Sequence, residues 1–148
     1  MADHFKYYLR VRYSECDAQK VVFNARYADY VDIATTEFLR ASCPDFGFIE
    51  YHLVKQTIEW KSPARFDQVL ELSVAVQHLG TTSFTIVTDF RVAGHEQLIT
   101  RAETVNVFID PATMKKTSIP ASLKAALERG APGTAIDHAG YFRSMTSD

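Results

Sequence analysis

The chain has 148 residues, a formal net charge of −2 and 47% apolar residues. This length suits one domain, and the apolar content is ordinary for a globular protein that builds its own core. The near-neutral charge, with no basic run longer than Lys115-Lys116, is not that of a DNA- or RNA-binding protein. We predict one domain over 1–148, with a core of about 5–129 and a C-terminal tail over 130–148, that binds no nucleic acid.

Signals for membrane insertion, secretion and metal binding are missing from the sequence. No stretch approaches the roughly 20 apolar residues of a membrane helix, and the N-terminus lacks the apolar core of a signal peptide. We therefore expect a cytoplasmic protein without a membrane span. Cys16 and Cys43 form no CxxC pair and the five histidines are spread out, so we expect reduced thiols and no metal site.

The order of the predicted elements follows from hydrophobic periodicity. Alternating residues predict a strand over 4–14, and a loop over 15–26 follows. Apolar residues at helical spacing predict a long helix over 27–41, which ends before Pro44 and Gly47. Four strands with a period of two come next, over 54–61, 69–77, 83–92 and 97–109.

The remaining segments complete the predicted fold. Pro120 opens a short helix that runs to Arg129, and 130–148 has no clear period. Four linked strands predict an antiparallel meander that the first strand joins, and the long helix must bury its apolar stripe against that sheet. The predicted class is α+β, one curved antiparallel sheet wrapped around a central helix. Its open edge strands favour a homo-oligomer, either a dimer or a tetramer.

The loop over 15–27 carries the candidate chemistry. Asp17 can project into a pocket beside the helix N-terminus, where unpaired N–H groups can hold an oxyanion. A carboxylate there can activate water or attack a carbonyl carbon directly. The simpler interpretation is that Asp17 bonds its own backbone in a turn. The neighbouring Cys16 has no histidine near it in the sequence, which argues against a cysteine nucleophile.

This loop resembles the signature of the 4-hydroxybenzoyl-CoA thioesterase family of the hot-dog superfamily. The matching positions in the loop are Asp17, Val21-Val22, Asn24 and Tyr27. Further likenesses are the turn at 63–67, Asp110-Pro111, Lys115 and Ile119-Pro120. The resemblance runs from about Tyr8 to about Leu127, nearly the whole predicted domain.

The resemblance implies an acyl-CoA thioesterase that cleaves the thioester of an acyl-CoA, or of an acyl carrier protein, to a free acid and a thiol. It implies Asp17 as general base or nucleophile, with oxyanion donors among the backbone N–H groups near Asn24 and near Glu50-Tyr51. The implied substrate-binding residues are Val22, Asn24, Tyr27, Glu50, Tyr51 and Lys115. No separate cofactor is expected, because coenzyme A is part of the substrate.

Two of these assignments keep an alternative. Lys115 either holds coenzyme A phosphates or is a solvated hairpin charge. Tyr27 fits helix packing better than a reacting hydroxyl. The chain departs from the family at Lys20, where glycine is common and a positive φ would cost lysine about 1 kcal/mol. It also has Gly80-Thr81-Thr82 where some members carry basic residues, and Arg26 where a small or amide side chain is frequent.

Two other functions remain as alternatives. One is a non-catalytic hot-dog module that binds an acyl chain or scaffolds a complex. Another is a hydratase of the same fold, which resembles a different motif with a histidine soon after the aspartate; residues 18–26 contain none. A serine thioesterase would need a GxSxG motif, which is missing.

Overall fold

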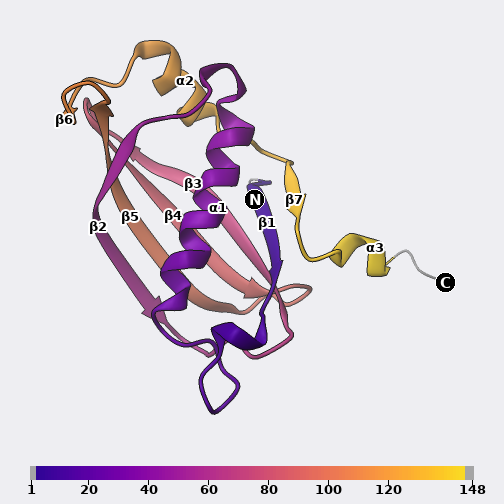
Figure 1. Ribbon diagram of the computed structural model, residues 1–148. Coiled ribbons are helices and arrows are strands. Elements are labelled where there is room, and N and C mark those ends of the chain that lie inside the picture. The colour runs from indigo at the N-terminus through magenta and orange to yellow at the C-terminus, as the bar shows by residue number, and fades with distance from the viewer. Residues whose placement is uncertain (1–2, 146–148) are drawn as a thin grey trace.

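Helix α1 (Arg26–Ser42) lies in the hollow of a curved sheet in the computed structural model, which describes residues 3–145 (Figure 1). Its bounds agree with the predicted helix over 27–41 to within one residue. The helix buries side chains spaced three and four residues apart, among them Tyr27, Tyr30 and Phe38. The α+β class and the hot-dog arrangement of one sheet around one helix are thus confirmed.

The sheet contains seven strands. They are β1 (Phe5–Arg10), β2 (Tyr51–Trp60), β3 (Val69–Leu79), β4 (Ser83–Val92), β5 (Leu98–Asp110), β6 (Lys115–Lys116) and β7 (Ala135–Asp137). Their order is β2-β5-β4-β3-β1-β7, and β6 pairs with the end of β5. Every pair is antiparallel except β1 with β7. The strand β2 therefore forms one edge of the sheet, and the C-terminal strand β7 forms the other.

The predicted four-strand meander is wrong at its first connection. Of these four strands, only β3, β4 and β5 lie beside their neighbours in sequence, whereas β2 pairs with β5. Residues 61–68 carry the chain past the ends of β5 and β4. Eight extended residues reach about 26 Å, and three strand spacings are only about 14 Å, so the connection is long enough to cross. A tight hairpin of two to five residues would have kept β2 beside β3.

The first strand is shorter than predicted. It leaves the sheet after Arg10, and a 3₁₀ turn, η1 (Tyr13–Glu15), replaces the end of the expected strand over 4–14. Val11 stays buried, and its N–H donates to the carbonyl of Gln68. Tyr13, which alternation would place on the same face as Tyr7 and Val11, is instead 70% exposed, because the chain has turned away from the sheet by that point.

Two shorter helical segments close the ends of the core. The 3₁₀ turn η2 (Pro44–Phe46) leads from α1 back to β2. Helix α2 (Ala121–Arg129) starts after Pro120, as predicted, and buries Leu123 and Leu127 against the core.

The tail is more regular than its lack of period indicated. It contains β7 and a short helix, α3 (Tyr141–Met145), while residues 146–148 lie outside the described part. Tyr8, on the otherwise polar face of β1, is buried because its ring stacks on Tyr141 at 5.2 Å and contacts Phe142. Its hydroxyl donates to Glu71. Across residues 3–145, no helix has the length and apolar character needed to cross a membrane.

Candidate functional site

Asp17 lies in a small exposed hairpin between β1 and α1. Cys16 and Val22 form an isolated antiparallel β-bridge, and the N–H of Asp17 donates to the carbonyl of Val21 at 2.9 Å. One carboxylate oxygen, Oδ1, accepts a hydrogen bond from the N–H of Gln19 at 2.8 Å. This is the self-bonded turn of the simpler interpretation. The other oxygen makes no hydrogen bond within residues 3–145, so Asp17 keeps an acceptor that faces solvent.

The hairpin turns at Lys20, which has a φ of 62°. The chain thus adopts at this position the left-handed conformation that glycine favours, and lysine carries the steric cost. The carbonyl of Lys20 accepts from the N–H of Phe66, and the N–H of Val22 donates to the carbonyl of Ala64. These bonds dock the hairpin onto the turn at 63–67, the second segment of the family resemblance.

Two of the predicted substrate-binding residues support the hairpin from inside. Val22 is 4% exposed and belongs to the core. The Tyr27 hydroxyl accepts a hydrogen bond from the N–H of Ala64 at 3.1 Å. Burial raises the pKa of Tyr27, so the phenol stays neutral. Both side chains therefore pack beneath the loop, as expected for Tyr27.

The start of α1 offers backbone donors close to Asp17 along the chain. Ala25 is the N-cap and no side chain caps the helix. Arg26 donates its N–H to Phe23, whereas the N–H groups of Asn24 and Ala25 have no acceptor in the described part of the chain. Unpaired donors of this kind suit an oxyanion. The Arg26 side chain pairs with Asp29 at 3.2 Å at the protein surface.

The two acidic residues of the loop have different surroundings. Glu15 is buried and accepts hydrogen bonds from Arg12 and Tyr30, a network that sequence periodicity did not reveal. In the amino-acid sequence, the sign of Glu15 was its place beside Asp17 in a small acidic cluster. Burial, together with these two carboxylates, raises the pKa of the Cys16 thiol. A neutral thiol is a poor nucleophile, which is consistent with excluding Cys16.

The other predicted residues lie at the far end of α1. Glu50 precedes β2 and Tyr51 is its first residue, near the C-terminus of α1, and Lys115 lies exposed in β6. Figure 1 shows the hairpin before α1 and strand β6 at opposite ends of the molecule. The helix between them has 17 residues and is therefore about 25 Å long. Within one chain, these three residues do not meet Asp17.

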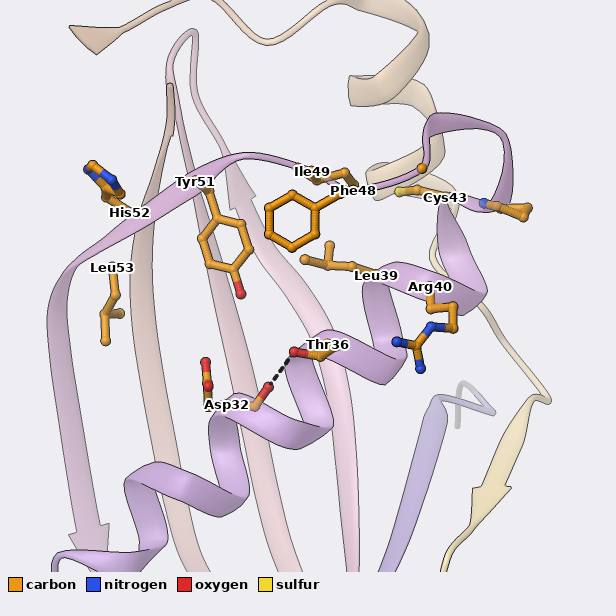
Figure 2. Close-up of a pocket in the computed structure, with 12 residues that line it drawn as sticks. Asp32, Thr36, Leu39, Arg40, Cys43, Phe48, Ile49, Tyr51, His52 and Leu53 are labelled. Carbon is orange, nitrogen blue, oxygen red and sulfur yellow. Dashed lines mark hydrogen bonds between the residues drawn. The ribbon is translucent and has the colours of Figure 1, made fainter. Parts of the chain in front are cut away.

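A large open cleft lies between the C-terminal half of α1 and the start of β2 (Figure 2). Its volume is about 790 Å³, and Leu39, Ile49 and Leu53 line it with apolar surface. The Tyr51 ring points from β2 toward the helix. Burial and the charge of Asp32 raise the pKa of Tyr51, so its hydroxyl stays neutral.

A smaller cleft of about 180 Å³ adjoins it, between the middle of α1 and strands β2 and β5. Its lining includes the polar side chains of Thr35, Gln56, Thr104 and Asn106. The Asn106 amide donates to the carbonyls of Phe84 and Thr104. Sequence analysis missed Thr104 and Asn106 of β5, because buried polar positions on a strand cannot be told from surface ones by alternation alone. Among residues 3–145, no group of three histidine, cysteine or acidic side chains is placed to hold a metal ion.

Comparison with known proteins identifies the family. The profile described as "Thioesterase-like superfamily" matches residues 11–127. The chain belongs to the thioesterase-like superfamily. It is 30% identical over 130 residues to the acyl-CoA thioester hydrolase YbgC of Escherichia coli O6:H1, an alignment that covers 84% of this chain and 96% of YbgC. The resemblance seen in the sequence and the thioester hydrolase class are thereby confirmed.

Solved structures give the same fold. A hypothetical protein from Aquifex aeolicus superposes with a TM-score of 0.73 at 28% identity, over 83% of this chain and 98% of that protein. A mutant 4-hydroxybenzoyl-CoA thioesterase, complexed with 4-hydroxybenzoyl-CoA, superposes with a TM-score of 0.71 over 85% and 99% of the two chains. At 19% identity, the latter is evidence of the shared fold alone. The roles of Asp17 and the predicted substrate-binding residues remain predictions.

Proposed function

We propose that the protein hydrolyses acyl-CoA thioesters, with Asp17 as the reacting carboxylate. The observation that carries this proposal is the free carboxylate oxygen of Asp17 in the hairpin that leads into α1, where Asn24 and Ala25 offer unpaired N–H groups. The names of the YbgC relatives support acyl-CoA as the substrate. Acyl carrier proteins present the same thioester and are a second possible source of it.

The chemistry needs one carboxylate and the amide donors. Asp17 takes a proton from a water molecule while the water oxygen bonds to the thioester carbon, and the carbonyl electron pair moves onto oxygen. The N–H groups stabilise that oxyanion. When the intermediate collapses, the C–S bond breaks and the thiolate takes up the proton held by Asp17. In the direct route, Asp17 attacks the carbon itself, the C–S bond breaks and the thiolate leaves. Water then hydrolyses the resulting anhydride to the free acid and the Asp17 carboxylate, and a proton released from that water goes to the thiolate.

The separation of the predicted residues favours a site shared by two chains. The edge strand β2 leaves Leu53 and Val54 51% and 59% exposed, and Phe48 beside it is 84% exposed. Apolar surface on an open edge favours pairing with another chain. An antiparallel pair of β2 strands would bring the Asp17 end of one protomer toward Tyr51 and Lys115 of the partner subunit.

Such a pair also gives the substrate a place. The acyl group would lie along α1 of one protomer in the apolar cleft, which the second chain closes, and its thioester would meet Asp17 of the partner subunit. The nucleotide of coenzyme A would stay at the surface, where the Lys115 ammonium group can pair with phosphate. This arrangement is a homo-oligomer whose smallest unit is a dimer.

Turnover by Asp17→Asn tests the proposal. With a panel of acyl-CoAs and titration of released thiol, we expect kcat to fall at least about 100-fold, because the amide cannot act as base or nucleophile. Asp45→Asn, another exposed aspartate outside the clefts, is the matched control and should keep wild-type activity. Intact turnover by Asp17→Asn would remove Asp17 from the mechanism. If the wild-type protein binds CoA esters without turnover, it is a binding module.

A further inference from the structure

Glu15 is a buried carboxylate that the proposed mechanism leaves unused. It ends the 3₁₀ turn η1 two residues before Asp17, and it is only 8% exposed. A charged side chain is seldom buried without partners, because losing its hydration is costly. Because Glu15 lies beside the Asp17 loop, its buried contacts can influence where that loop sits.

All the acceptor capacity of this carboxylate is used. Oε1 accepts from the N–H of Arg12 at 2.8 Å and from the hydroxyl of Tyr30 at 2.7 Å. Oε2 accepts from the Arg12 guanidinium at 3.0 and 2.8 Å. An ionised carboxylate has about four acceptor sites, so Glu15 has none left for a water molecule or a substrate. It therefore acts on its neighbours rather than on the thioester.

The contacts join three parts of the protein. Tyr30 is a fully buried residue of α1, one turn after the start of the helix. Arg12 belongs to the segment that follows β1. The carbonyl of Glu15 accepts from the N–H of Phe23 at 2.9 Å and so closes the base of the Asp17 hairpin. Glu15 thus links the hairpin both to the helix and to the segment that follows β1.

The bonds suit an ionised carboxylate. Burial acts to raise the pKa of Glu15, but the hydrogen bonds from Arg12 and Tyr30 outweigh it, and the pKa lies below its usual value. Hydrogen bonds to an ionised oxygen are shorter and stronger than neutral ones. A link of this kind is stiff enough to hold a short loop in register with a helix.

We propose that Glu15 is a positioning residue, whose link to Tyr30 and Arg12 holds the Asp17 hairpin at a set distance from the amide donors that begin α1. The inference rests on the proposed role of Asp17. Misplacement of a reacting group by about 1 Å can cost about 100-fold in rate. Loss of the link should therefore reduce kcat more than it changes KM.

Tyr30→Phe is the main test, because it removes one hydroxyl and leaves the ring in the core. We expect kcat to fall about 10-fold or more with KM within about two-fold. Hydrogen exchange of the Asp17 and Lys20 amides, both bonded within the hairpin, should become faster. The matched control is Tyr8→Phe, which removes another buried hydroxyl, bonded to Glu71 at 2.9 Å on the opposite face of β1 from the core, and should leave kcat unchanged.

Glu15→Gln completes a double-mutant cycle with Tyr30→Phe. Because both changes weaken the same bond, the double variant should lose less activity than the two single losses multiplied together. A fall in melting temperature with kcat and loop exchange unchanged would make Glu15 structural only and overturn the inference. Multiplicative losses would overturn it as well.

Asp17→Asn separates this inference from the proposed function. If Asp17→Asn abolishes turnover while Tyr30→Phe behaves like Tyr8→Phe, only the role of Glu15 fails. If Asp17→Asn keeps full turnover, the proposed role of Asp17 fails, and with it the inference. Should the Glu15 variant not fold, the comparison of Tyr30→Phe with Tyr8→Phe still decides the question.

Discussion

The hydroxyl of Tyr27 accepts a hydrogen bond from the main-chain N–H of Ala64, at a distance of 3.1 Å. Both residues are buried. The bond joins the first turn of α1 to the turn on which the Asp17 hairpin rests. It gives this tyrosine a structural reason to stand at the start of the helix, independent of any contact with substrate.

Tyr27→Phe should destabilise the protein, because a buried N–H without an acceptor costs roughly 1–3 kcal/mol. For a chain of this length we expect the melting temperature to fall by about 3–10 °C, measured by circular dichroism. Tyr13→Phe is the control, since the Tyr13 side chain is 70% exposed. Equal melting temperatures for the two variants would contradict the assignment.

Lys20→Gly should stabilise the protein. Glycine relieves roughly 1–2 kcal/mol of left-handed strain at this φ of 62° and loses about 0.5–1 kcal/mol in chain entropy, a net gain of about 0.5–1 kcal/mol. Urea unfolding measures it. Gln19→Gly, next to it but without a positive φ, should bring no gain. A loss of stability in Lys20→Gly would show that the lysine side chain has a role of its own.

The pKa of Glu15 predicts a loss of stability in acid. A carboxyl with a folded-state pKa below its unfolded value stabilises the protein fully above the unfolded value, here about 4.5. That contribution is lost as the pH falls through the lower, folded-state pKa. The melting temperature of wild type should therefore exceed that of Glu15→Gln at neutral pH, and the gap should close below about pH 4.5. A gap that stays constant from pH 7 to pH 3 would argue against this account.

The open edge of β2 predicts how the oligomer forms. Leu53→Lys combined with Val54→Lys should shift the protein to monomers in light scattering and lower turnover, because two chains share the proposed site. Met114→Lys is the matched control, since Met114 is 57% exposed but lies in the hairpin between β5 and β6. A monomeric variant with full activity would place the whole site in one chain.

The proposed contact of Lys115 with coenzyme A phosphates can be tested by comparing two substrates. Lys115→Ala should raise KM for an acyl-CoA about 3- to 10-fold, the loss of roughly 1 kcal/mol for an exposed charge pair. KM for the corresponding acyl-pantetheine, which lacks the nucleotide phosphates, should not change. Lys116→Ala provides the control in the same hairpin. An equal rise in KM for both substrates, or no rise for either, would indicate that Lys115 is a solvated charge of the hairpin and does not bind phosphate.

Parts of the candidate site could be foreseen and parts could not. The Asp17 loop stood out because acidic residues precede an apolar pair and a helix within a dozen positions. The Tyr30 partner of Glu15 did not, because the two residues are 15 positions apart and meet only when α1 packs against η1. The sequence likewise did not predict that Thr104 and Asn106 line the smaller cleft beside α1.

The amino-acid sequence by itself determined the elements whose signal is local. The period of α1 and the alternation of β4 are properties of neighbouring residues, and their bounds were predicted to within one residue. Only the tertiary structure decided that β2 pairs with β5, and that Tyr8 is covered by Tyr141. Those contacts join segments far apart in the chain. Which of them form depends on the burial and hydrogen bonding of the whole molecule, and no local pattern records it.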